Sequence, residues 1–140
     1  MRNLRIAIIL FSTLLILSCS GNSTSNKGTS TEDLSAGEKI YKSKCAVCHQ
    51  AGGMGVPQVF PPLANNQAVS GDKTYLIKTI LDGLTGPIEV NGVKYNGVMT
   101  PFSDLSDKEV ADLLTYLRGS LGNNGDAVTE QEVKAFRIKQ

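Results

Sequence analysis

Apolar and polar residues follow two periods along the chain, and the period predicts the structure of each segment. Spacings of three and four residues, typical of a helix with one buried face, occur in residues 35–44, 72–83, 106–119 and 129–139. Residues 88–95 instead alternate with a period of two, which is typical of strands. Polar or glycine-rich stretches separate these segments. The pattern therefore predicts a mostly helical domain with one small hairpin.

The first two predicted helices have recognisable boundaries. Ser35 and Glu38 have the spacing of a capping box, so we expect the first helix to begin at Ser35. It should end near Lys44. Asp72 can cap the second helix, and Gly83 ends it. The buried face of this second helix is expected to include Tyr75, Leu76, Thr79 and Ile80.

Two more helices are predicted in the C-terminal part of the chain. Ser106 and Glu109 form a second capping-box pattern, and Gly119 ends the helix that follows. Thr129 and Glu132 cap a short last helix, which comes after the break GNNG. The apolar face of the third helix should hold Val110, Leu113, Leu114 and Leu117.

The predicted hairpin lies between the second and third helices. Its sequence, IEVNGVKY, places Asn91 and Gly92 between two alternating segments. Asn-Gly suits the type I′ turn, which needs positive φ at both central residues. We therefore expect two short antiparallel strands joined by this turn.

Length and charge narrow the class of protein. The 140 residues carry a formal net charge of +1, and the basic residues do not gather into the patch that a nucleic-acid surface needs. Few helices joined by long loops, such as residues 52–68, bury little apolar surface. A domain of this kind often relies on a metal, a disulfide or a cofactor for its core.

The first 18 residues have the pattern of an export signal. Arg2 and Arg5 precede IAIILFSTLLIL, an almost purely apolar run at residues 6–17. A basic start followed by a short apolar run is typical of a secretory signal. A short transmembrane anchor is the alternative, but a membrane-spanning helix needs ~20 apolar residues, which is longer than this run.

Cys19 follows the apolar run directly, in the sequence ILSC. This sequence resembles the bacterial lipobox, which implies that residues 1–18 are removed and that Cys19 is lipidated. Ordinary cleavage nearby, which leaves a free thiol, is the alternative. Residues 19–32 are rich in Ser, Thr, Asn and Gly, so they predict a flexible tether after the lipid.

The hexapeptide CAVCHQ is the strongest chemical signal in the sequence. It places Cys45 and Cys48 three positions apart and follows them with His49, the only histidine. A thioredoxin-type switch would need a βαβ setting, and a structural zinc site would need four ligands. A disulfide between the cysteines would leave His49 unexplained. C-x-x-C-H is the signature of covalent haem attachment, and this is the chemistry that we expect.

The spacing has a physical reason. Two thiols three residues apart on a helical turn can reach the two vinyl groups at one edge of the porphyrin, and the next residue then lies beneath the iron. His49 is therefore the expected proximal ligand. Met99, which lies far downstream, is the expected ligand on the opposite face, because His/Met is the usual axial pair of cytochromes c. Met54 is too close to His49 in sequence, and we expect it to cover the cofactor's apolar surface.

A ligating histidine usually donates its second ring N–H to an acceptor, which fixes the orientation of the ring. The loop VFPPLAN begins about ten residues after His49, and the carbonyl of Pro61 or Pro62 can serve as this acceptor. Phe60 and Leu63 should pack against the ring. The alternative is a merely rigid proline turn.

Residues 33–121 resemble the class I c-type cytochromes. The resemblance implies an all-α class I cytochrome c fold, with three main helices around one covalently bound haem c, a small β-hairpin before the distal methionine and a short C-terminal helix. It also implies that Cys45 and Cys48 bind the haem and that the first and third helices cross at a glycine. The matching positions are Gly37, Tyr41, Cys45, Cys48, His49, Pro61, Leu63, Met99 and Tyr116.

More narrowly, the stretches GVPQVFPPLAN, GLTGPIEVNGVKYNGVMTPF and LSDKEVADLLTYLR are similar to a bacterial subgroup. Its members occur as free cytochromes, as domains of copper nitrite reductases and as cytochrome subunits of membrane dehydrogenases. In this subgroup a hairpin precedes the distal methionine, and the hairpin predicted around Asn91 and Gly92 matches this feature.

The expected function is single-electron transfer between respiratory or dehydrogenase partners at the outer face of a bacterial membrane. The expected partners are redox proteins and, through lipidated Cys19, the membrane; neither nucleic acid nor a small-molecule substrate is expected. The sequence has no second histidine, nucleophile–base pair or phosphate loop, so no enzyme activity is expected. A fixed subunit of an oxidase, reductase or dehydrogenase complex is the main alternative, and a haem peroxidase or gas sensor is another.

These observations predict four parts in the chain. They are a lipoprotein signal peptide at 1–18, a tether at 19–32 that carries Cys19, a cytochrome c domain at 33–121, and a C-terminal extension with a short helix at 122–140. The exported protein should be lipid-anchored on the periplasmic or cell-surface side.

Overall fold

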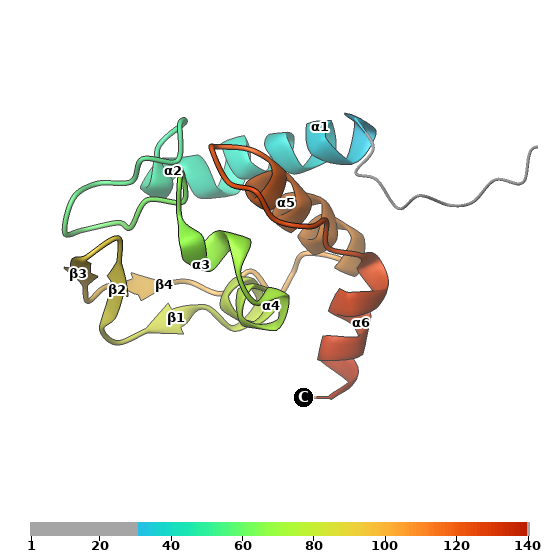
Figure 1. The fold of residues 1–140 in the computed structure, drawn as a ribbon. Coiled ribbons are helices and arrows are strands. Elements are labelled where there is room, and N and C mark those ends of the chain that lie inside the picture. The colour runs from blue at the N-terminus through green and yellow to red at the C-terminus, as the bar shows by residue number, and fades with distance from the viewer. Residues whose placement is uncertain (1–30, 140) are drawn as a thin grey trace, which may run out of the picture.

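The computed structural model describes residues 31–139, and helices form most of its regular structure (Figure 1). The predicted signal peptide, the lipidated Cys19 and all but the last two residues of the tether lie outside the described residues. In chain order the elements are α1 Thr31–Ile40, a π-helix at Tyr41–Cys45, α2 Ala46–His49, α3 Gln67–Ser70, α4 Lys73–Asp82, β1 Leu84–Thr85, β2 Ile88–Val90, β3 Val93–Tyr95, β4 Val98–Met99, α5 Asp107–Gly119 and α6 Glu130–Ile138.

The first helix begins earlier than the sequence predicted. It starts at Thr31, so Ser35 and Glu38 lie inside α1 and form no capping box. The carboxylate of Glu38 instead pairs with Lys42, one turn further on, at 2.7 Å. Glu32 is one of two acidic residues in the first turn of α1, where the helix dipole favours negative charge. The predicted start at Ser35 is therefore wrong.

The helical run continues past the predicted end through a π-helical turn. The N–H of Ala46 bonds the carbonyl of Tyr41, five residues back, and α2 then carries the chain to His49. A π-turn inserts one extra residue per turn and shifts the helical phase, and such turns are common at functional sites. Tyr41 and Cys45 are both buried in this turn.

Helix α4 has the predicted ends but a different buried face. The side chain of Asp72 accepts a hydrogen bond from the N–H of Thr74 at 2.7 Å, and Gly83 ends the helix with φ +76°. Tyr75 is exposed, contrary to the prediction, and Thr79 is only half-buried. The buried positions of α4 are Leu76, Ile77, Ile80 and Leu81.

Helices α5 and α6 confirm the two C-terminal predictions. Each begins with a complete capping box, formed by Ser106 with Glu109 and by Thr129 with Glu132. The predicted face of α5 is buried: Val110, Leu113, Leu114 and Leu117. Val133 of α6 is fully buried as well, so this last helix is part of the core.

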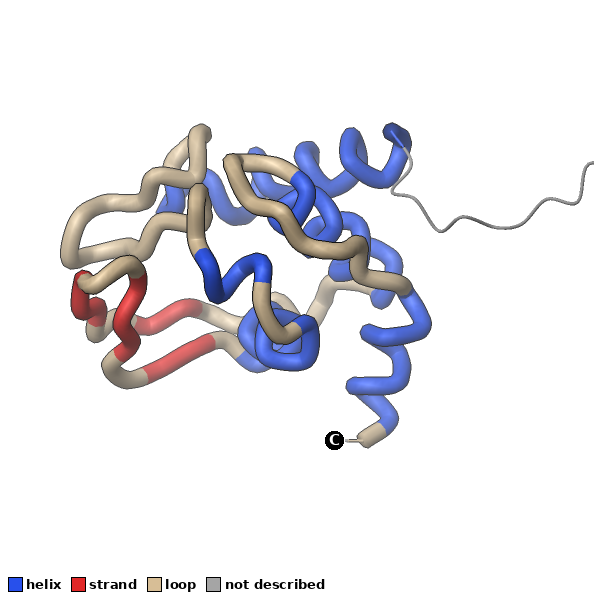
Figure 2. The backbone as a smooth tube through the Cα atoms, viewed as in Figure 1, coloured by secondary structure: helices blue, strands red, loops and turns tan. Residues whose placement is uncertain are grey.

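The strands form two small antiparallel pairs, which lie together on the opposite side of the fold from α6 (Figure 2). β2 and β3 are the predicted hairpin, with Ile88 opposite Tyr95 and with positive φ at Asn91 and Gly92. The pairing of β1 with β4 was not predicted. It places Leu84 opposite Met99.

Helices α1 and α5 cross with their backbones in close approach at Gly37. A Cβ atom at position 37 would meet the carbonyl oxygen of Asp112 and would lie 2.6 Å from the Cβ of Tyr116. Beside the crossing, the rings of Tyr41 and Tyr116 are 5.7 Å apart. The predicted crossing at a glycine is therefore confirmed. Within residues 31–139, no helix has the length and apolar character to cross a membrane.

We predict that Gly37→Ala destabilises the haem-loaded protein by about 2–3 kcal/mol, because overpacking of this kind forces helices apart. Chemical denaturation followed by circular dichroism measures the change. Gly119→Ala in α5 is the matched control, since a Cβ there would lie 3.7 Å from its nearest neighbour, Leu34. Equal stabilities of the two variants would contradict the close approach at Gly37.

Candidate functional site

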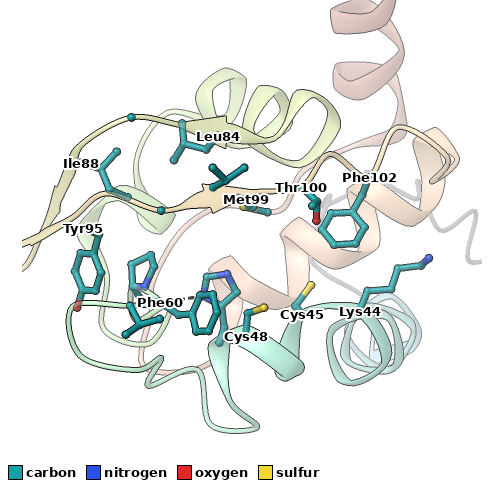
Figure 3. A pocket seen from close by; sticks show the side chains of 16 residues that line it. Lys44, Cys45, Cys48, Phe60, Leu84, Ile88, Tyr95, Met99, Thr100 and Phe102 are labelled. Atoms are coloured by element: carbon teal, nitrogen blue, oxygen red, sulfur yellow. Dashed lines mark hydrogen bonds between the residues drawn. The ribbon is translucent and has the colours of Figure 1, made fainter.

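A cleft with an empty volume of about 880 Å³, part of it open to solvent, separates the Cys45–His49 segment from the strands. Figure 3 shows Cys45 and Cys48 on one wall and Met99 on the other. The lining of the cleft is mostly apolar and includes Val59, Phe60, Leu84, Ile88, Tyr95, Val98, Met99 and Phe102.

His49 is held in one orientation by the predicted acceptor. Its Nδ1 lies 2.9 Å from the carbonyl oxygen of Pro61. A carbonyl can only accept, so Nδ1 carries the proton and Nε2 is the nitrogen left to bind a metal. Burial lowers the pKa of His49, an effect that the Pro61 carbonyl partly opposes. The imidazole is therefore neutral at pH 7, which is the form that ligates metals.

The turn after His49 is fixed by local hydrogen bonds. The hydroxyl of buried Tyr41 donates to the carbonyl of Gln50, whose φ is +64°. The N–H of Gly55 donates to the carbonyl of His49 at 2.9 Å. A side chain at Gly55 would collide with the carbonyl of Phe60. This loop therefore returns toward Pro61 with little freedom, and it keeps the acceptor beside the ring.

The two motif cysteines line the cleft. Cys45 is buried and Cys48 half-buried, and neither takes part in a disulfide. Across the described residues, no three or more Cys, His, Asp or Glu side chains gather as a metal-binding group.

Met99 is positioned by the β1–β4 pair and by the glycine that ends α4. It is half-buried and lines the cleft from β4. The backbone of Gly83 approaches Met99 so closely that a Cβ there would meet the Met99 carbonyl and lie 3.0 Å from the nitrogen of Pro101. Gly83 also has φ +76°, which favours glycine. Gly83 thus determines how close the Met99 strand lies to α4.

Met54 does not take the position that we expected. Its side chain is 66% exposed and does not line the cleft, so the prediction that it covers the cofactor is wrong. Phe60 lines the cleft as expected, whereas Leu63 packs against the helical core.

Several cleft residues were missed by the sequence analysis. Ile88 and Tyr95 face each other across the hairpin, and the alternation of its strands could have indicated a shared apolar face. Val59, Val98 and Phe102 lie in loops or at a strand end, where no periodicity signals burial.

Comparison with known proteins establishes the family. The family model of cytochrome c matches residues 34–120. The chain is 43% identical over 113 residues to cytochrome c-552 from Thermus thermophilus, which covers 74% of this chain and 86% of that protein. The chain therefore belongs to the cytochrome c family and is a class I c-type cytochrome.

Two further relatives are components of larger proteins. The cytochrome c subunit of the quinone alcohol dehydrogenase of Gluconobacter oxydans is 35% identical over 105 residues, which cover 73% of this chain and 22% of that subunit. The cytochrome c subunit of gluconate 2-dehydrogenase from Pantoea cypripedii is 34% identical over 110 residues, 76% of this chain and 25% of that subunit.

The family assigns the cofactor and the class of function, and the residues of the cleft fit both. The cofactor is one haem c, bound covalently through Cys45 and Cys48, and the chain is an electron-transfer protein rather than an enzyme by itself. The cleft suits haem c, because it presents two thiols on one wall, an oriented imidazole, and a thioether on the opposite wall. Its apolar lining suits the porphyrin ring.

We predict that Gly83→Ala shifts the Met99 strand and lowers the stability of the haem-loaded protein by about 2–4 kcal/mol, because strain at positive φ adds to a backbone collision. Denaturant unfolding provides the measurement. Gly92→Ala is the matched control, since Gly92 has a similar φ of +79° and nothing within 4 Å of a Cβ. A loss no larger than that of the control would show that Gly83 imposes no spacing on Met99.

Proposed function

We propose that the protein is a single-electron carrier in which Nε2 of His49 and Sδ of Met99 are the two axial ligands of the haem iron. The observation that supports this most directly is the hydrogen bond from His49 Nδ1 to the Pro61 carbonyl, 2.9 Å long, which leaves Nε2 for the metal. Met99 lines the opposite wall of the same cleft, whereas Met54 is exposed outside it.

When bound, haem c supplies an iron that passes one electron at a time between its ferrous and ferric states. The chain's own residues determine the conditions for this exchange. Pro61 fixes the tautomer of His49 and increases its basicity. The thioether of Met99 favours the reduced state and raises the reduction potential. The apolar lining, with Phe60 and Phe102, limits the access of water and so also affects the potential.

We predict that Met99→Ala removes the low-spin spectrum of the oxidised protein and lowers the reduction potential, because the iron loses its sulfur ligand. The reduced variant should also bind carbon monoxide, which the original protein should resist. Absorption spectroscopy and redox titration measure these changes. Met54→Ala is the control and should leave both properties unchanged. A low-spin spectrum retained in Met99→Ala but lost in Met54→Ala would reverse the assignment.

Partners are the second part of the proposal. The relatives named as dehydrogenase cytochrome subunits favour a dehydrogenase as electron donor, with the domain acting either as a mobile carrier or as a fixed subunit. The likeness to a cytochrome c-552 over most of that protein's length favours the mobile carrier. We infer that the partners are redox proteins, and that the chain itself needs no small-molecule substrate.

The position at a membrane is the third part. The sequence ILSC at residues 16–19 supports removal of residues 1–18 and lipidation of Cys19, which would anchor the domain, at 33–121, to the outer face of a bacterial membrane. Several acyl chains suffice for a stable anchor where one does not. The intervening residues are polar and suit a tether. Residues 122–140 form the C-terminal extension.

We predict that Cys19→Ala moves the haem-loaded protein from the membrane fraction to the soluble fraction, because the lipid is its only proposed anchor. Haem staining of fractionated cells and the mass of the purified protein are the measurements. Absorption spectrum and potential should not change, since Cys19 lies outside the haem domain. A variant that stays with the membrane would mean that the apolar segment or a partner holds it there.

A further inference from the structure

The C-terminal extension contacts the segment that follows Met99. Helix α6 lies beyond residue 120, where the match to the cytochrome c family model ends. It packs against α5, with Val133 fully buried between them and Phe136 against the core. Arg137 stands in the last turn of α6. Its guanidinium therefore comes from a part of the chain outside the matched domain.

Arg137 binds the segment between Met99 and α5 at three places. Its Nε donates to the Asp107 carboxylate at 2.7 Å, and its two Nη atoms donate to the carbonyls of Ser103 and Leu105. Arg137 is only 32% exposed and Asp107 22%. A planar guanidinium carries N–H groups on three separate nitrogens and can reach acceptors that lie apart, whereas the three donors of a lysine all sit on one nitrogen.

The segment that Arg137 holds is continuous with the distal wall of the cleft. The N–H of Leu105 donates to the Phe102 carbonyl at 3.2 Å, and the N–H of Phe102 donates to the Ile80 carbonyl at 2.8 Å. Phe102 lines the cleft, three residues after Met99. A displacement of Ser103 and Leu105 would therefore move the strand that carries Met99.

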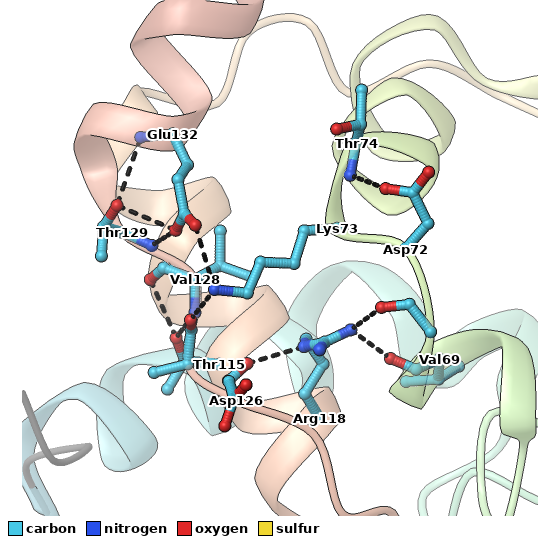
Figure 4. Close-up of polar contacts among 12 residues, drawn as sticks. Val69, Asp72, Lys73, Thr74, Thr115, Arg118, Asp126, Val128, Thr129 and Glu132 are labelled. Atoms are coloured by element: carbon cyan, nitrogen blue, oxygen red, sulfur yellow. Dashed lines mark hydrogen bonds and ion pairs between the residues drawn. The ribbon is translucent and has the colours of Figure 1, made fainter.

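The C-terminal extension that carries Arg137 is held to the rest of the fold by polar contacts (Figure 4). Lys73 of α4 donates to Glu132 at 3.0 Å and to the Ala127 carbonyl at 2.6 Å. Thr115 of α5 and Val128 exchange two hydrogen bonds, of 3.1 and 3.0 Å. The extension is thus joined to the helices on both sides of the distal segment.

We propose that Arg137 is a positioning residue for the distal ligand: by fixing Ser103, Leu105 and Asp107 to α6, it keeps Met99 on the iron. The proposal rests on the proposed function, in which Met99 is the axial ligand. Without the guanidinium, the loop from Met99 to α5 keeps its hydrogen bond to α4, the core packing of Leu105 and the exposed ion pair of Asp104 with Lys44, 3.5 Å long, but it loses its link to α6. Met99 should then leave the iron more often, while the covalent haem and His49 stay in place.

The test measures ligand exchange and global stability separately in the full-length, haem-loaded protein. The variants are Arg137→Gln, Arg137→Lys and, as the matched control from an exposed position of the same helix, Lys134→Gln. Carbon monoxide affinity of the reduced protein reports how readily Met99 leaves. Denaturant unfolding followed by circular dichroism reports global stability.

We expect Arg137→Gln to bind carbon monoxide at least roughly tenfold more tightly than the original protein, since hydrogen bonds to a charged group change an equilibrium by that factor or more. Arg137→Lys should be intermediate, and Lys134→Gln should match the original protein. The absorption band of the methionine-bound ferric protein should also disappear at lower denaturant than the helical signal in Arg137→Gln.

A second comparison separates positioning from general stability. Asn123 lies in the same extension as Arg137, and its side-chain amide donates hydrogen bonds of 2.8 Å to the carbonyls of Leu63 and Leu117. Asn123→Ser removes these two bonds, and neither of them involves the segment that follows Met99. It should reduce stability without raising carbon monoxide affinity. Equal affinities in Arg137→Gln and Asn123→Ser at similar stability would overturn the proposal. If Met99→Ala itself bound carbon monoxide no better than the original protein, the ligand assignment would be at fault instead.

Discussion

Helices α1 and α5 cross at Gly37 with almost no space between their backbones, and the positions of both walls of the haem cleft depend on this crossing. The run that begins with α1 continues through the π-turn to Cys45, Cys48 and His49, so the crossing places the attachment motif. Helix α5 begins where the distal segment ends, and α6 packs on it. One close contact thus fixes the proximal wall directly and supports the distal wall through α5.

The two walls are held by different kinds of contact. On the proximal wall the contacts are short in sequence: His49 to Pro61, Tyr41 to Gln50 and Gly55 to His49. On the distal wall they join distant parts of the chain, from α4 through Phe102 and from α6 through Arg137. Local contacts cost less loop entropy to form than distant ones. We therefore regard the methionine side as the one whose geometry the rest of the fold tunes, whereas the orientation of His49 itself depends mainly on local hydrogen bonds.

Signals that are local in sequence were sufficient for much of the fold. The capping boxes at Ser106 and Thr129 and the Asn91–Gly92 turn each depend on residues within a few positions, and all are present in the structure. The same kind of signal failed at Ser35, because the helix continues upstream and an internal ion pair uses Glu38 instead. The π-turn, the β1–β4 pair and the exposed Met54 depend on tertiary packing, which no single-sequence period encodes. The attachment motif could be predicted because its chemistry requires one fixed spacing of residues. The apolar lining from Val59, Val98 and Phe102 could not be predicted, because these residues follow no periodic pattern.

The central claim is that one cleft presents the His49 imidazole and the Met99 thioether to opposite faces of the same iron. A crystal structure of the haem-loaded protein tests it most directly. The account predicts Nε2 of His49 and Sδ of Met99 bonded to the iron, with the hydrogen bond from Nδ1 to the Pro61 carbonyl retained. An iron ligated on its distal face by Met54 or another side chain, or a Met99 turned out of the cleft, would contradict it.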